Sequence, residues 1–237
     1  MNCCQCQGIE CVFDSTQAAK KLRAYRADGP AKTTRMLLDE LKAAGVEGQT
    51  LLDIGGGVGA IQHELADAGV SGVTSVEASQ GHLGAAQEEA HRRGYAHRVT
   101  YHHGDFVDLA PRIEAADIVT LDRVICCYHD VEALVGLSAA RARQLYCLVF
   151  PRDTWWMKLA TAAMNLYYRV SRNPFRTFVH PTPVVDALVR RHGLTQRFYR
   201  RTALWQVVVY QRSDAMAVTR PSHSPAGSRL GSSVNNP

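Results

Sequence analysis

Short apolar runs alternate with longer amphipathic stretches through the middle of the 237-residue chain. The apolar runs predict strands at 50–54, 72–76, 99–103, 117–121 and 145–150. The stretches between and after them predict helices at 60–68, 80–93, 131–140 and 154–170. Strands that alternate with helices in this way are typical of a parallel sheet with helices on both faces.

The alternation ends near the C-terminus, where 194–201 and 204–210 are two strand-like runs joined by a short turn. Such neighbours must be antiparallel, because a parallel pair needs a long crossover. We therefore predict an α/β fold with a seven-stranded, mostly parallel, doubly wound sheet that finishes in an antiparallel hairpin.

The chain divides into four predicted segments. Residues 1–14 are rich in cysteine, and 15–48 form a helical cap with apolar residues at helical spacing, interrupted at 28–30. Residues 49–212 hold the α/β domain. The tail at 213–237 is rich in Ser, Pro, Gly and Asn, and we expect it to be disordered.

Composition adds few restrictions. The chain is 46% hydrophobic and 21% charged with a formal net charge of +5, which is too mild to favour a nucleic acid as partner. No stretch has the apolar length of a membrane span, and the first residues lack the pattern of a secretory signal. We therefore expect a cytoplasmic protein with reduced thiols, and the sequence does not indicate its oligomeric state.

The N-terminal cysteines are the only metal-ligand candidates. Cys3, Cys4, Cys6 and Cys11 offer four thiolates, but their spacing matches no pair of Cys-x-x-Cys knuckles. Adjacent cysteines also bind one tetrahedral ion only with strain. We expect no metal, and these four residues are the weak alternative.

A glycine-rich loop, Gly55-Gly56-Gly57-Val58-Gly59, directly follows the first predicted strand. Glycines allow a ligand to approach the backbone, and the helix that follows offers unpaired N–H groups to an anion. The same glycines and Glu77, at the end of the second strand, also fit a dinucleotide. An NAD(P)-dependent oxidoreductase is therefore the alternative that this loop leaves open.

Three features favour another ligand. Asp53 places a carboxylate beside the loop, where it would repel a phosphate but tolerate an ammonium or a sulfonium. Gly104-Asp105-Phe106 follows the third strand and offers an acceptor and an aromatic ring to an adenine, although Asp105 also suits a helix cap. The terminal hairpin is the third feature, and the dinucleotide interpretation does not predict the three together.

Four segments, 51–59, 76–79, 104–106 and 117–124, resemble in order and spacing the motifs of class I S-adenosylmethionine-dependent methyltransferases. The resemblance implies S-adenosylmethionine as cofactor and assigns roles to matching positions. The methionine part would lie near Asp53, Gly55, Gly57 and Gly59, and Asp122 with Arg123 would lie near the methionine end or the substrate. The ribose and adenine would lie near Glu77, Ala78, Asp105 and Phe106. Upstream, Tyr25 either meets the methionine carboxylate or packs its helix, and Glu77 has the alternative of a solvated strand end.

Methyl transfer from a sulfonium mainly requires that donor and acceptor are aligned and that water is excluded. A base is needed only if the acceptor must lose a proton, and His129 is the candidate, with Asp130 orienting it or capping the next helix. Cys126 and Cys127 are interpreted as core residues. A non-catalytic module that binds the same cofactor remains a further alternative.

We expect a small-molecule acceptor that is methylated at oxygen, since no segment resembles the Asn-Pro-Pro-Tyr motif of amino-directed nucleic-acid enzymes. Residues 155–201 are rich in aromatic and basic side chains, which predict an aromatic pocket for a planar, carboxylated acceptor such as a tetrapyrrole. The candidates are Trp155, Trp156, Tyr167, Tyr168, Arg152, Arg172 and Arg176. The alternative is an amphipathic helix with core aromatics and a basic, solvated face.

Overall fold

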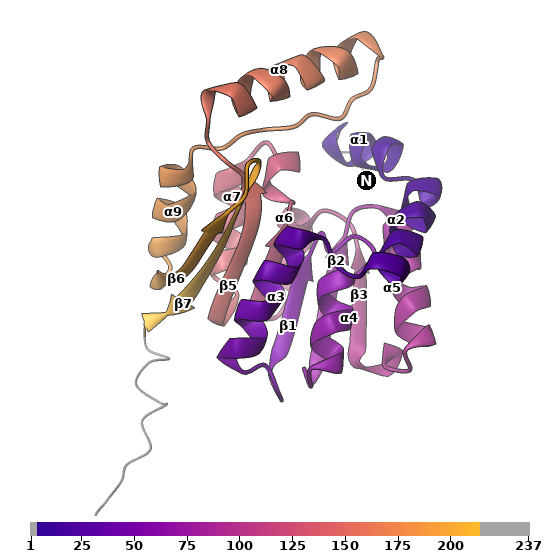
Figure 1. Cartoon of the computed structure of the whole chain (residues 1–237), viewed down its shortest axis with the longest axis vertical. Coiled ribbons are helices and arrows are strands. Elements are labelled where there is room, and N and C mark those ends of the chain that lie inside the picture. The colour runs from indigo at the N-terminus through magenta and orange to yellow at the C-terminus, as the bar shows by residue number, and fades with distance from the viewer. Residues whose placement is uncertain (1–3, 214–237) are drawn as a thin grey trace, which may run out of the picture.

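The structure is a computed structural model that describes residues 4–213, with side chains from residue 8 onward. Its centre is one seven-stranded sheet in the order β3-β2-β1-β4-β5-β7-β6 (Figure 1). The strands are β1 (Thr50–Ile54), β2 (Gly72–Glu77), β3 (Val99–His103), β4 (Ala116–Asp122), β5 (Ala142–Pro151), β6 (Leu194–Arg201) and β7 (Trp205–Arg212). β1 to β5 are parallel, and β7 runs antiparallel between β5 and β6. This confirms the predicted sheet and its terminal hairpin.

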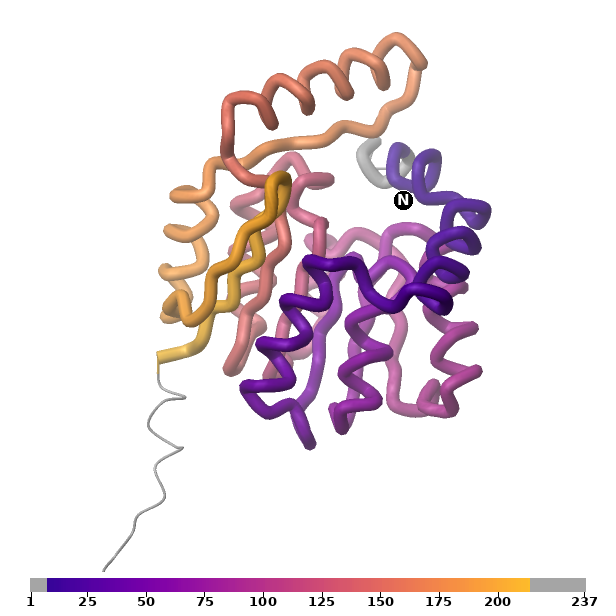
Figure 2. Tube along the Cα trace, in the orientation of Figure 1, coloured from indigo at the N-terminus to yellow at the C-terminus, as the bar shows by residue number. Residues whose placement is uncertain are grey.

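Helices cover both faces of the sheet (Figures 1 and 2). One face carries α3 (Lys32–Ala44), α4 (Ala60–Asp67) and α5 (Gln80–Arg92), whose apolar residues join those of the strands. The other face carries α6 (Phe106–Leu109), α7 (Val131–Ala139) and α9 (Thr182–Arg190). Three short 3₁₀ turns complete this part of the fold, at Ala96–Arg98, Ala110–Arg112 and Ile125–Cys127.

Three helices lie near the edge of the sheet where the parallel strands end. They are α1 (Cys4–Val12), α2 (Ser15–Asp28) and α8 (Trp155–Val170), and Figure 2 shows the course of the chain through them. The helical N-terminal extension that we predicted is therefore present. None of the helices in the described part of the chain is long and apolar enough to span a membrane.

Polar side chains fix where several helices begin. Asp14, Ser79, Asp105 and Asp130 each accept a hydrogen bond from a backbone N–H in the first turn of the following helix. The caps of α5, α6 and α7 lie just beyond β2, β3 and the turn after β4. They therefore help to place the loops at one end of the sheet.

Three helices were not predicted from the sequence, namely α1 in the cysteine-rich segment, α6 and α9. α9 begins with Thr182 and Pro183 and buries Val185, Leu188 and Val189 at helical spacing, so a recognisable signal was present. α6 has only four residues, too few to show a period. The tail predicted after residue 212 lies outside the described residues apart from Ser213.

Candidate active site

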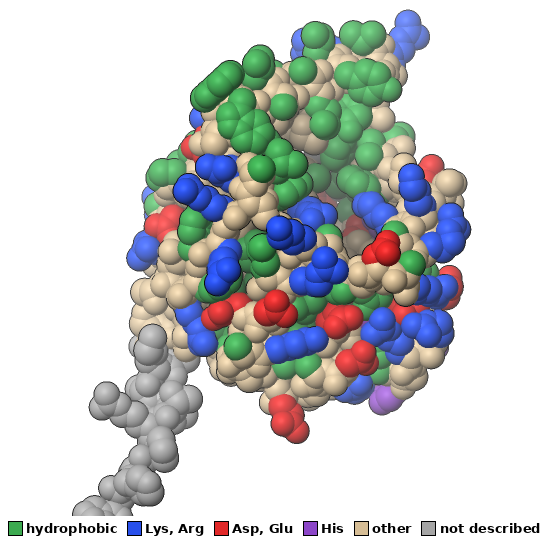
Figure 3. Space-filling model, viewed as in Figure 1, with side chains coloured by type: hydrophobic (Ala, Val, Ile, Leu, Met, Phe, Trp, Pro, Cys, Tyr) green, Lys and Arg blue, Asp and Glu red, His purple; other side chains and the backbone are tan. Residues whose placement is uncertain are grey.

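A cavity of about 890 Å³ lies between the carboxyl ends of β1, β2 and β4 and the helices α1, α2 and α8. Loops at this end of a parallel sheet are where α/β proteins bind ligands. Figure 3 shows the hollow beneath α8, with hydrophobic side chains on its walls and charged side chains at its lower rim. The glycine loop forms its floor.

The loop after β1 exposes its backbone to this cavity. Gly55 and Gly57 have φ angles of 64° and 60°, in the region that side chains rarely tolerate. No atom lies within 4 Å of the position that a Cβ of Gly57 would occupy. A ligand can therefore approach the loop closely. Gly59 does not line the cavity, and instead begins α4 with a φ of 83°.

Glu77 is buried at the end of β2 and is not a solvated strand end. Its Oε2 accepts a hydrogen bond from the Gly57 N–H at 2.9 Å, and its Oε1 accepts one from the Ser79 N–H at 2.9 Å. Burial raises the pKa of Glu77, and these N–H donors oppose the rise. The side chain thus links the glycine loop to the start of α5, and both Glu77 and Ala78 line the cavity.

Asp53 lies fully buried beneath the loop. Its Oδ1 accepts a hydrogen bond from Thr120 Oγ1 at 2.7 Å, whereas Oδ2 has no hydrogen-bond partner among the described residues. Burial raises the pKa of Asp53 to about 7, and the nearby negative charges of Asp122 and Glu77 add to the rise. Any side chain at Gly56 would collide with this carboxyl group.

Asp105 caps α6, which is one of the two roles predicted for it. Oδ1 caps α6 by accepting from the Val107 N–H at 2.8 Å, and Oδ2 accepts from the Tyr128 hydroxyl at 2.9 Å. The neighbouring Phe106 is buried and lines the same wall of the cavity. Tyr128 was not predicted as a site residue.

Asp122 is the last residue of β4 and Arg123 follows it, and both line the cavity. Asp122 Oδ2 accepts a hydrogen bond from Thr34 Oγ1, and burial raises the pKa of this aspartate. Arg123 has a φ of 62°, which is strained for a residue with a side chain. Its guanidinium lies 5.0 Å from the Trp205 ring centroid, and its Nε has no hydrogen-bond partner among the described residues.

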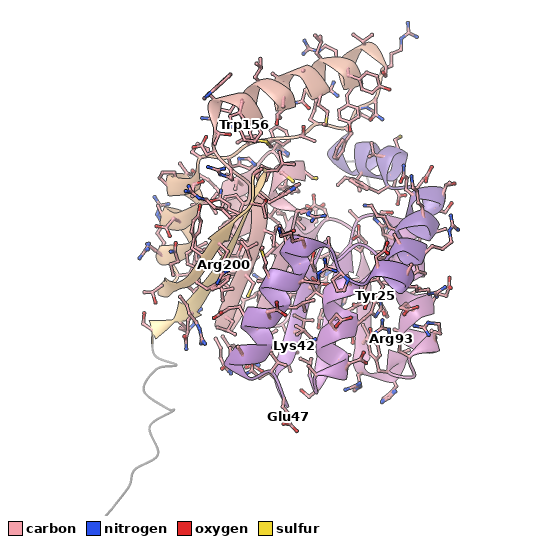
Figure 4. All side chains as sticks on the ribbon, viewed as in Figure 1. Tyr25, Lys42, Glu47, Arg93, Trp156 and Arg200 are labelled. Carbon is pink, nitrogen blue, oxygen red and sulfur yellow. The ribbon has the colours of Figure 1, made fainter. Side chains whose placement is uncertain are left out.

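Tyr25 lines the cavity with its ring, but its hydroxyl is occupied elsewhere. It donates to Glu64 Oε1 at 3.0 Å and accepts from Arg93 Nη2 at 2.9 Å. Figure 4 shows Tyr25 and Arg93 close together, on α2 and at the end of α5. Of the two predicted alternatives for Tyr25, this geometry favours packing.

The predicted base, His129, does not line the cavity. Its ring stacks against Tyr128 with the centroids 5.4 Å apart, while Asp130 caps α7 through the Ala133 N–H. Cys126 and Cys127 do line the cavity, with their sulfur atoms 3.8 Å apart, so the prediction that they only fill the core was incomplete.

The predicted acceptor pocket differs from the observed one. Of the four aromatic candidates only Tyr168 lines the cavity, and none of the three predicted arginines does. Figure 4 places Trp156 at the start of α8, at the top of the molecule. The α8 residues that line the cavity are Met157, Thr161, Met164 and Tyr168. The arginines that do so are Arg35 and Arg123.

The N-terminal cysteines lie mostly beyond the description. Cys3 and the side chains of Cys4 and Cys6 are outside it, and Cys11 is an exposed free thiol. Within the part of the chain that is described, no three His, Cys, Asp or Glu side chains are grouped to hold a metal ion.

The charges of the cavity fit S-adenosylmethionine better than a dinucleotide. Around the glycine loop the carboxyl groups of Asp53 and Glu77 are buried and that of Asp122 is half-buried, and Lys21 is the lining cation that interacts with Glu77. A ligand with an ammonium and a sulfonium offsets this negative charge, whereas a pyrophosphate would be repelled. The partnerless Oδ2 of Asp53 points to the same conclusion.

Residues 52–139 match the family model described as a methyltransferase domain. This match and the fold confirm the class predicted from the sequence, a class I methyltransferase dependent on S-adenosylmethionine. They favour this class over an oxidoreductase. Comparison with curated protein sequences gives no match.

Solved structures with the same fold span most of the chain. Magnesium protoporphyrin IX methyltransferase from Synechocystis PCC 6803 is 20% identical, with a TM-score of 0.67 over 86% of this chain and 98% of its own. An O-methyltransferase family protein from Burkholderia thailandensis is 19% identical, with a TM-score of 0.65 over 86% and 63%. Geranyl diphosphate methyltransferase is 14% identical, with a TM-score of 0.63 over 84% and 91%. At these identities the likeness concerns the fold.

Proposed function

We propose that the chain transfers the methyl group of S-adenosylmethionine to an oxygen of a small, largely apolar molecule that carries a carboxylate. The observation that carries this proposal is the continuity of the cavity from the glycine loop to the underside of α8. Its volume of about 890 Å³ is near the upper end of the roughly 300–1,000 Å³ typical of ligand pockets. This leaves room for an acceptor beside the cofactor.

The cofactor half of the cavity has donors and acceptors for each part of the ligand. Glu77 would accept from the ribose hydroxyls, and Asp105 from the adenine amine, with Ala78 and Phe106 beside the ring. Gly55 and Gly57 would meet the methionine part through their backbone. Asp53 and Asp122 would offset its positive charge. When bound, the cofactor supplies a methyl group on a good leaving group.

The acceptor half combines apolar side chains with the guanidinium of Arg123. Met157, Met164 and Tyr168 form a ceiling that suits an apolar body. Below it, the Arg123 guanidinium lies 3.7 Å from Asp122 Oδ1 through Nε and donates to Thr33 Oγ1 through Nη2, and its Nε makes no hydrogen bond with a described residue. Arginine pairs well with a carboxylate because its planar fork donates two parallel hydrogen bonds.

A carboxylate acceptor also explains why the cavity manages without His129 as a base. Free carboxylic acids have a pKa of about 4 and are ionised at neutral pH, so no proton has to be removed. The protein then has to align the oxygen with the methyl group and to exclude water. Arg123 would perform the alignment, and α8 would cover the acceptor.

The names of two similar structures support a small-molecule acceptor. Magnesium protoporphyrin IX and geranyl diphosphate, after which those proteins are named, are both small molecules with a large apolar part. Neither name fixes the acceptor of this chain. We propose a carboxylate as the acceptor group because Arg123 lies below the apolar side chains of α8.

The test has two stages. Calorimetric titration with S-adenosylmethionine should show binding that Glu77→Ala abolishes, and titration with NAD should show none. Apolar carboxylic acids are then screened with a labelled methyl donor. A methyl ester is recognised because mild alkali releases its label as methanol, which methylated nitrogen or carbon does not do.

Arg123→Ala should raise the KM for a carboxylate acceptor about 10- to 100-fold, as expected for a lost charge-assisted hydrogen bond. Its affinity for S-adenosylmethionine should stay the same. Arg200→Ala is the matched control, because Arg200 lies exposed on β6, away from the cavity (Figure 4). Alkali-stable product, or equal effects of the two variants, would contradict the proposed acceptor.

A further inference from the structure

α8 has two apolar faces, only one of which is used by the cavity. Met157, Thr161, Met164 and Tyr168 follow one another at intervals of four, three and four residues, and all four line the cavity. Residues at these intervals share one face of a helix. The inner face of α8 is therefore the ceiling of the site.

The outer face is apolar and open to solvent. The apolar side chains of this face are Trp155 (76% exposed), Leu159 (63%), Leu166 (61%) and Val170 (75%). They are spaced by four, seven and four residues. No residue of α8 is buried. Figure 3 shows hydrophobic side chains gathered along this helix at the top of the molecule. Contiguous apolar surface of this kind marks an interaction site.

The charged residues of α8 and of the segment that follows it are all basic. Residues 154–185 contain Lys158, Arg169, Arg172 and Arg176 but no aspartate or glutamate. Lys158 pairs with Asp153 just before the helix at 2.7 Å. Arg169 and Arg172 are exposed and make no ion pair with any described residue. The apolar face is thus flanked by cationic groups that can meet an anionic partner.

We propose that the outer face of α8 docks on the surface of an anionic lipid bilayer. A helix with a wide apolar face, tryptophan at its end and basic residues at its flank is the kind that lies in the membrane interface. Anionic headgroups would pair with Arg169 and Arg172 while Trp155, Leu159, Leu166 and Val170 enter the acyl boundary.

A second copy of the chain fits this face less well. A two-fold contact between α8 helices sets the same patch of each copy against the other, and since residues 154–185 contain no acid, Arg169 and Arg172 would find no anionic partner on the facing helix. A bilayer supplies the missing negative charge. Since the inner face of α8 roofs the cavity, docking would also place the acceptor half of the cavity close to the lipid.

The experiment is co-flotation of the full chain with vesicles, without any donor or acceptor. Vesicles of phosphatidylcholine alone are compared with vesicles that contain about one third phosphatidylglycerol. We expect binding to the anionic vesicles that high salt weakens, and a blue shift of tryptophan fluorescence. Arg169→Glu with Arg172→Glu should weaken binding by at least about fivefold for each charge removed.

Leu159→Glu should reduce binding about tenfold or more, because a charge would enter the apolar boundary. Val184→Glu is the matched control, since Val184 is an exposed apolar residue on a different helix, α9. Both variants should retain the affinity for S-adenosylmethionine of the unchanged chain, which shows that they are folded.

Absence of binding to anionic vesicles would overturn the inference, as would equal losses in Leu159→Glu and Val184→Glu. If the chain does not bind vesicles but forms a dimer in solution, and Leu159→Glu dissociates that dimer, then the outer face of α8 contacts a second copy of the chain instead. Because the assay uses no methyl donor, its failure would leave the proposed reaction untouched.

Discussion

Replacing Asp53 by asparagine should change how the stability of the fold depends on pH. The Asp53 carboxyl is fully buried, keeps one hydrogen bond from Thr120 and has a pKa raised to about 7, first by burial and then by Asp122 and Glu77. Asparagine keeps the oxygen that accepts from Thr120 and carries no charge at any pH. The variant therefore removes the titration while preserving the size of the side chain.

The sign and size of the effect follow from linkage. Because the folded-state pKa of Asp53 lies above its ordinary value of 3.8, its contribution to stability is complete below that value and is lost as the pH rises through about 7. The whole shift corresponds to about 4 kcal/mol. Roughly 2–3 kcal/mol of this falls between about pH 5 and pH 8.

The assay is urea-induced unfolding of both proteins, followed by circular dichroism at about pH 5 and about pH 8. The asparagine variant should gain about 2–3 kcal/mol relative to the unchanged chain over this interval, or about 1 M in its urea midpoint. His63, whose pKa burial lowers to about 4, titrates in both proteins and cancels in the comparison.

Asp39→Asn is the control, because Asp39 is exposed on α3 and its replacement should leave the pH dependence unchanged. If the free energy of unfolding changes by the same amount in Asp53→Asn and in the unchanged chain between the two pH values, then Asp53 is ionised throughout. The reasoning about its buried, partnerless oxygen would then be refuted.

Two further substitutions test the cap and the loop. Glu89, a buried acid on α5, receives hydrogen bonds from Arg26 of α2 and from two arginines of α5, which hold its pKa well below the usual range. Glu89→Gln should lower the free energy of unfolding by about 2 kcal/mol. The loss is smaller than for a fully buried ion pair, because the arginines are partly exposed to solvent. Glu88→Gln is the control and should leave the free energy of unfolding unchanged, because Glu88 is exposed. At Gly57, which has φ 60° and open space around it, alanine should cost about 1 kcal/mol by thermal unfolding and abolish cofactor binding by calorimetry. Gly48→Ala, with φ 74° and equally open surroundings outside the cavity, should cost the same and leave binding intact.

The sheet could be predicted because its strands carry their signal locally. The run at 50–54 coincides with β1, a central strand that is mostly buried and therefore appears as an apolar segment. The run at 99–103 coincides with β3, an edge strand without a buried residue, which Val99, Thr100 and Tyr101 indicate by their strand propensity. The terminal hairpin was equally clear, because the connection is too short for any other pairing. α9 was overlooked although its apolar spacing is regular.

The acceptor side could not be predicted, because it depends on which way side chains point. Tyr128 has an extended backbone, with φ −125° and ψ 128°, so successive side chains point to opposite sides. Tyr128 reaches Asp105 in the cavity, and the adjacent His129 does not line it. The sequence shows both residues but not which of them faces inward.

α8 illustrates the same limit on a larger scale. Apolar residues occupy more than half of its circumference, so its sequence cannot tell the cavity face from the outer face. Trp155 and Tyr167 are attractive candidates by residue type, yet they are 76% and 68% exposed. The position of the helix above the sheet decides that Met157 and Tyr168 line the cavity instead.

The buried carboxyl groups connect the fold to the choice of ligand. Asp53 and Asp122 have raised pKa values because burial disfavours their charged forms. A cationic ligand stabilises those charged forms, so it binds with the help of groups that otherwise cost the fold stability. A phosphate would meet the opposite situation and would bind only with both carboxyls protonated. The glycine loop permits either ligand to approach, and the acids beneath it decide which one is held.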